Sequence, residues 1–93
     1  MTAPSYRYPA PASRDPVLHE LPPLHLANQS ITLHLSIRRD DDGGWRAKLR
    51  FIDPELRALD TAEIFCGASE SELWQSVHRL QEHHLRALYL SLL

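Results

Sequence analysis

The chain has 93 residues, of which 43% are hydrophobic and 24% are charged, and its formal net charge at neutral pH is -2. This balance is typical of one small globular domain and excludes a polycation that attracts nucleic acid non-specifically. No stretch approaches the roughly 18 uninterrupted apolar residues of a membrane-spanning helix, and the N-terminus lacks the apolar core of a secretory signal. Cys66 is the only cysteine, which excludes an intramolecular disulfide and a multi-cysteine metal site. We therefore expect a cytoplasmic protein with no cofactor and no membrane partner.

Prolines dominate the N-terminal part of the sequence. Six of the seven prolines fall at or before Pro23, and each one removes a backbone donor and restricts the residue before it. We interpret residues 1–16 as a flexible proline-rich tail, because prolines and small residues offer little surface to bury. Residues 17–30 carry five aliphatic side chains, too many for a solvated linker, and are predicted to be a linker that is partly docked on the domain or on a partner. Residues 31–93 are predicted to form a single α+β domain.

Two alternating apolar patterns flank an acidic turn that ends in glycine. Apolar residues occupy every second position over 31–37 and again over 45–51, which is the period of half-buried strands. Both sets are odd-numbered, so an antiparallel pair that keeps them on one face needs an odd number of loop residues. We predict a three-residue loop over 41–43, with Gly43 in the left-handed conformation, which pairs Leu35 with Leu49.

A short connection and a third strand are predicted after this hairpin. Asp53 and Pro54 are suited to the N-cap and first position of a short helical turn that reaches residue 59, because the missing N–H of proline costs nothing there. Residues 61–66 then alternate and stop at Gly67, which predicts a strand. The sequence does not indicate its place beside the hairpin.

The C-terminal quarter of the chain predicts one long helix. Ser69 and Glu72 form a capping box, and an apolar stripe that includes Leu73, Val77 and His84 follows. A helix over 70–93 would be about 36 Å long at 1.5 Å per residue, whereas a seven-residue strand spans about 24 Å. We expect the C-terminal end of the helix to overhang the sheet.

That overhanging end is apolar on all sides and needs cover. Fraying or cover by residues 17–26 is one interpretation, and a subunit or partner interface is the other. An ordered core of about 60 residues without a disulfide is marginal alone, and symmetric dimers are the commonest small oligomers. The predicted partner interface consists of Leu85, Leu88, Tyr89, Leu90, Leu92 and Leu93.

The outer face of the hairpin is a second candidate site. Its polar positions carry cations that could hold the phosphates of a nucleic acid, namely Arg38, Arg46, Lys48 and Arg50. The alternative interpretation is an ordinary solvated sheet face. No aromatic residue on these two strands interleaves with the cations to stack bases, and aspartates at 40–42 place negative charge at one end.

Histidines and carboxylates give little indication of chemistry. Six histidines are present, but none shows paired ligand spacing on one element, so no metal site is predicted. His84 lies in the middle of the apolar stripe, where a neutral core histidine is usual. If it lies in an interface, protonation below about pH 6 would weaken assembly. No carboxylate pair stands out as a general acid and base, and we expect a protein that is not an enzyme.

These elements together predict the α+β class: a two-layer domain of order ββ(turn)βα, with a three-stranded antiparallel sheet and one long C-terminal helix packed on one face. In the order of its elements this domain resembles several small bacterial regulators, including antitoxins of the HicB-like kind. The leading hypothesis is a small non-enzymatic protein-interaction module that acts as a homodimer or an adaptor through the apolar helix end. The alternative hypothesis is an antitoxin-like regulator that binds nucleic acid through the basic outer face.

Overall fold

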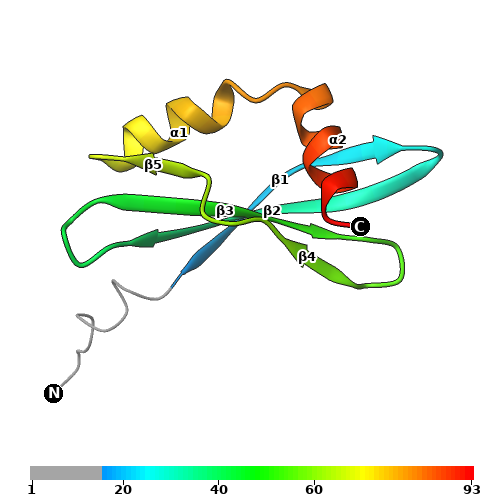
Figure 1. Ribbon diagram of the computed structural model, residues 1–93, viewed down its shortest axis with the longest axis horizontal. Coiled ribbons are helices and arrows are strands. Elements are labelled where there is room, and N and C mark those ends of the chain that lie inside the picture. Colours follow the sequence, from blue (N-terminus) through cyan, green and yellow to red (C-terminus); the bar gives the residue numbers. More distant parts are fainter. Residues whose placement is uncertain (1–15) are drawn as a thin grey trace, which may run out of the picture.

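The computed structural model describes residues 16–93, which form a five-stranded antiparallel sheet and two C-terminal helices (Figure 1). The strands are β1 (Val17–Leu26), β2 (Gln29–Arg39), β3 (Trp45–Ile52), β4 (Ala58–Asp60) and β5 (Phe65–Gly67), and the helices are α1 (Glu70–His78) and α2 (Glu82–Ser91). The α+β class and the antiparallel sheet are as predicted, but a sheet of three strands with one long helix is wrong. All but the last residue of the predicted tail, 1–16, lies outside the described residues.

The first difference is β1, which occupies the region where the sequence predicts a docked linker over 17–30. This strand pairs with β2 from Val17 opposite Ile37 to Leu26 opposite Gln29, through a two-residue turn whose residues have positive φ. Such a turn matches the twist of a hairpin. Pro22 and Pro23 fall at an irregularity in the pairing. Proline is tolerated there because β1 is an edge strand, and its outward side needs no ladder donor.

The β2–β3 hairpin has the predicted register. Leu35 lies opposite Leu49, and Gly43 has a φ of 86°. The amide of Asp40 donates to the carbonyl of Gly44 at 2.7 Å and closes the three-residue loop. The predicted register and the three-residue loop are therefore confirmed.

The strand predicted over 61–66 is wrong in its bounds, because residues 61–64 lie outside the sheet and only residues 65 and 66 belong to β5. β4 occupies the end of the segment predicted as a helical turn. β4 and β5 both pair with β3, and an interruption over 61–64 separates them. The interruption begins at Thr61, whose hydroxyl accepts a hydrogen bond from the Leu49 amide at 3.0 Å and donates to the Ala62 carbonyl at 2.7 Å. A side chain thus takes over one ladder contact, and residues 62–64 leave the sheet before β5 resumes pairing. Residues 53–57 form a tight turn rather than a helical one.

The predicted long helix is broken into α1 and α2. α1 begins as expected, because the Ser69 hydroxyl accepts from the Glu72 amide and the Glu72 carboxylate accepts from the Ala68 amide. The break at 79–81 lets α2 turn back over β1 instead of overhanging the sheet (Figure 1). The mismatch between helix and strand lengths is thereby resolved by a bend.

The core lies between the sheet and the two helices. It combines the odd-numbered apolar residues of β2 and β3 with Leu24 of β1 and Phe65 of β5, and with one or two side chains from each helix. Tyr89 anchors α2 there, because its ring is 5% exposed and lies 5.4 Å from the ring of Phe51. Both helices contact the same face, so no element of residues 16–93 covers the opposite face, which we call the outer face (Figure 1).

Candidate interaction surface

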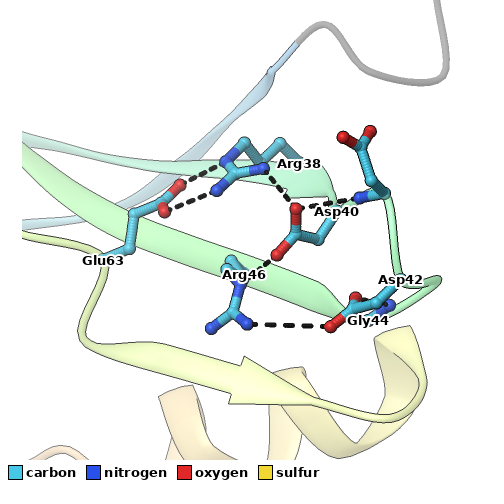
Figure 2. A network of polar contacts seen from close by, with 7 residues as sticks. Arg38, Asp40, Asp42, Gly44, Arg46 and Glu63 are labelled. Atoms are coloured by element: carbon cyan, nitrogen blue, oxygen red, sulfur yellow. Dashed lines mark hydrogen bonds and ion pairs between the residues drawn. The ribbon is translucent and has the colours of Figure 1, made fainter.

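The four cations predicted as a nucleic-acid site lie together on the outer face, because they occupy even-numbered positions of β2 and β3, which point away from the core. At the end nearest the acidic loop, Arg38 donates to both carboxylate oxygens of Glu63 at 2.6 and 2.8 Å. Asp40 accepts from Arg38 at 3.3 Å and from Arg46 at 2.6 Å. Figure 2 shows this arrangement, with the Arg38 guanidinium between Glu63 and Asp40.

The other two cations share one carboxylate. Asp60 of β4 accepts from Arg50 through both oxygens, at 2.8 and 3.1 Å, and its Oδ2 lies 3.1 Å from the Lys48 ammonium. The hydrogen bond from Arg50 lowers the pKa of Asp60 to about 2, and the hydrogen bond from Arg46 similarly lowers the pKa of Asp40 to about 2. All four cations are thus paired with carboxylates.

This pairing bears on the nucleic-acid hypothesis. The four cations of the outer face contact four carboxylates, those of Asp40, Asp42, Asp60 and Glu63. Their charges cancel, and a phosphate that approached would have to displace these carboxylates and would release few counterions. The sequence revealed the cations and the acidic loop but not the other two partners, Asp60 and Glu63, because β4 and the interruption after it bring these two to this face.

His84 is exposed and does not lie in the core. Its Nδ1 accepts a hydrogen bond from the Gln81 amide at 3.1 Å at the start of α2. The ring therefore serves as a helix cap, a role that needs Nδ1 unprotonated. It also forms part of an apolar hollow described below.

The structure separates the six residues of the predicted partner interface. Tyr89 is buried in the core of its own domain, whereas Leu90 and Leu93 are 52% and 69% exposed. The other three are half-buried and pack against the edge of the core: Leu85, Leu88 and Leu92. The C-terminal helix end is thus partly covered by the domain itself, and its exposed apolar side chains are those of Leu90 and Leu93.

An apolar groove, which we call the junction groove, lies between the proline irregularity of β1 and the break between α1 and α2. Its volume is about 340 Å³, and its floor reaches core residues of the sheet. Apolar side chains form both walls, namely Leu21, Pro22 and Pro23 on the strand side and Val77, Leu80 and Leu85 on the helix side. Two polar residues, His78 and Glu82, lie on the helix side of its rim.

A second apolar hollow, the junction patch, lies against α2 and shares Leu80 with the groove. Its other members come from α2 and from the interruption between β4 and β5: Ile64, His84, Ala87, Leu88 and Ser91. Ile64 is 45% exposed. Leu80 thus connects two apolar hollows at the point where the helix layer opens.

The turn over 53–57, which we call the Leu56 turn, presents an exposed leucine on a rigid frame. Asp53 Oδ1 accepts from the amides of Glu55 and Arg57, both at 2.9 Å, and Oδ2 accepts from the Arg57 side chain at 2.7 Å. The hydrogen bond from the Arg57 amide lowers the pKa of Asp53. Leu56 has a φ of 66° and is 82% exposed. The left-handed conformation costs a residue with a Cβ about 1 kcal/mol or more.

The sequence did not single out Leu80, the two prolines or Leu56 as site residues. Leu80 is brought to a site by the break between the helices, and the two prolines by the strand character of β1. Neither feature has a local signal in the sequence. Leu56 had one: it is the only aliphatic residue between Asp53 and Ala58, in a segment predicted to turn.

Metal-ligand geometry does not add to these surfaces in the part of the chain that the structure describes. Within residues 16–93 no three His, Cys, Asp or Glu side chains are grouped to hold a metal ion, and no helix of that part is long and apolar enough to cross a membrane. Cys66 is an exposed free thiol on β5. No protein-family model, curated protein or solved structure matches this chain.

Proposed function

We propose that this protein is a small non-enzymatic interaction module that self-associates through the apolar surface at the break between α1 and α2. The observation that carries the proposal is the position of Leu80, which lines both the junction groove and the junction patch. Two apolar hollows that share a residue form the kind of surface that a partner covers.

The charge distribution favours this function over nucleic-acid binding. The cations of the outer face are held by carboxylates, whereas the junction groove is lined mostly by aliphatic side chains and prolines. Burial of apolar surface drives protein association, while binding to nucleic acid depends on cations that are available to phosphates. The apolar surface therefore supports the interaction module better.

A second copy of the chain is the partner that the argument favours. The domain is small and has no disulfide within the described residues, so burial against a copy would add the core area that a small chain lacks. The chain also carries exposed aliphatic residues away from the groove, among them Leu56 and Leu93. A symmetric pair can cover such residues and the groove at the same time.

The test places a charge in the junction patch without disturbing the core. Ala87 is exposed on α2, so Ala87→Glu leaves the fold intact, which circular dichroism can check. A carboxylate buried at an interface would lose its hydration, and we expect self-association to weaken about tenfold or more, measured by sedimentation velocity over a range of concentrations. Gln75→Glu is the matched control, because Gln75 is exposed on α1 and lines neither hollow. Equal association of Ala87→Glu and wild type would overturn the proposal.

A further inference from the structure

The start of α2 is capped by a histidine, and this cap depends on the charge of the ring. The Gln81 amide donates to Nδ1 of His84 at 3.1 Å. In a capping box this bond is ordinarily accepted by glutamate or glutamine. An imidazole nitrogen accepts only while it carries no proton, because both nitrogens of a charged ring are donors. Protonation of His84 at Nδ1 therefore removes the hydrogen bond to the N-cap residue.

Two further features make a charged His84 unfavourable for the helix. The centroid of the His83 ring lies 4.0 Å from that of the His84 ring, so two charged imidazoles repel each other at short range. Both rings belong to the first turn of α2, at the positive end of the helix dipole, where cations are unfavourable. A charged His84 thus weakens the start of α2 through the lost cap, through its neighbour and through the dipole.

The other charged and titratable groups around α2 offer a charged His84 no partner in the junction patch. Glu82 is paired with an arginine one turn further along α2, and Glu63 is paired with an arginine of β2. No acidic side chain of residues 16–93 lines the junction patch. The remaining groups on the elements near α2 also lie outside it, namely His19, Glu20 and His25 of β1, His78 of α1 and Arg79 at the break. The ring of His83 is thus the titratable group that faces His84.

The cap lies beside the residue on which self-association is proposed to depend. Leu80 directly precedes the N-cap residue Gln81 and lines both hollows, and His84 itself lines the junction patch. On the α1 side, the Leu80 amide donates to the Val77 carbonyl at 3.1 Å. On the α2 side, the position of residue 81 depends on the first backbone bonds of the helix and on the His84 cap. Loss of the cap therefore loosens one side of the break, where Leu80 lies.

We propose that His84 is a pH-sensitive switch that controls self-association. This inference rests on the proposed function and identifies how the same surface is regulated. Histidine ordinarily changes its charge between pH 5 and 8. While the ring is neutral, α2 is capped and the two hollows keep their shape; once the ring is charged, the first turn of α2 loosens and the surface for a second copy changes. The contribution of the cap is present above this pH range and is lost as the pH falls through it.

The decisive variant is His84→Gln. Glutamine keeps the capping box, because its side-chain oxygen accepts from the N-cap amide, and it gains no proton at any relevant pH. We expect wild type to associate about tenfold more weakly at low pH than at neutral pH, because each chain of a pair must restore its cap. The association of His84→Gln should be equal under both conditions. Sedimentation velocity over a range of concentrations, at about pH 7.5 and about pH 5.5, covers most of the range in which histidine changes its charge.

His78→Gln is the matched control. His78 is exposed and lines the junction groove, but it does not cap α2, so this variant should keep the pH dependence of wild type. The outer face does not interfere with the comparison. The arginine partners of Asp40 and Asp60 lower the pKa of both carboxyl groups to about 2, and their ion pairs stay intact under both conditions.

The cap is also tested without reference to association. The melting temperature of wild type should fall between the two conditions by about 4 °C more than that of His84→Gln, as loss of a helix cap in a small domain implies. In wild type at neutral pH, the nitrogen resonance of the His84 ring should show Nδ1 without a proton. A protonated Nδ1 at neutral pH, or an equal fall of the two melting temperatures, would overturn the switch.

The outcomes distinguish this inference from the function on which it rests. If wild type and His84→Gln respond equally to pH while Ala87→Glu does not associate, the switch is overturned and the proposed function stands. If wild type is monomeric at every pH and concentration, both are overturned. Weaker association at low pH in wild type and His78→Gln, but not in His84→Gln, supports the switch.

Discussion

The two faces of this domain differ in whether their side chains have partners within the chain. On the outer face, four cations meet four carboxylates supplied by the acidic loop, by β4 and by the interruption that follows it. On the helix side, the break between α1 and α2 leaves two apolar hollows that share Leu80. A cluster of cations in a sequence therefore does not identify a binding surface until its partners are known, whereas the apolar surface at a break in the helix layer remains available.

The largest effect on stability is expected from removing the side chain that anchors α2 to the core. Tyr89 is the only buried residue of α2, and its ring packs on Phe51. Tyr89→Ala should lower the free energy of unfolding by about 3 kcal/mol, as for other large aromatic truncations in a core. Urea denaturation followed by circular dichroism measures this change. A loss below about 1 kcal/mol would mean that α2 is held elsewhere, and the two hollows would then need another description.

Low pH is expected to weaken the ion pairs of the outer face and so to destabilise the fold. The pKa values of Asp40 and Asp60 are lowered from 3.8 to about 2 by their arginine partners. A lowered pKa in the folded state means that each carboxylate stabilises the fold fully above about pH 5, and that this contribution is lost as the pH falls from about 4 to 2. Thermal unfolding between pH 6 and pH 2 should show a steady fall of the melting temperature in that window. A constant melting temperature down to pH 2 would contradict the ion-pair network.

A smaller effect is expected from removing one carboxylate of the outer face. Asp60→Asn takes away the partner shared by Lys48 and Arg50 and should lower the free energy of unfolding by about 1 kcal/mol, the upper range for pairs at a surface. It also frees two cations, so binding to a polyanion such as heparin should increase and should fall with salt. Equal retention of this variant and wild type on heparin would show that the pairing does not control the charge of this face.

Several parts of the fold follow from the sequence because they depend on local signals. The register of the hairpin follows from parity and from Gly43, and the start of α1 follows from Ser69 and Glu72. The interpretation of 17–30 as a linker came from the prolines. It missed β1 because the cost of a proline depends on whether the strand lies at an edge, which only the assembled sheet decides.

The break between the helices illustrates the limit of local patterns. The length mismatch between helix and strand indicated a conflict, but residues 79–81 contain neither glycine nor proline, so nothing marked a bend. The bend is stabilised by burial of Tyr89 and by the cap that His84 provides. The burial of Tyr89 depends on packing across the sheet, which no local pattern reveals. For the same reason the sequence placed the interface at the end of the helix and missed Leu80.

We propose that the apolar surface at the break between α1 and α2 holds two copies together. The most direct test is light scattering of the intact chain, with wild type and Ala87→Glu compared at several concentrations. We expect twice the mass of one chain for wild type and a shift toward the mass of one chain for Ala87→Glu. A wild-type mass of one chain at every concentration would contradict it.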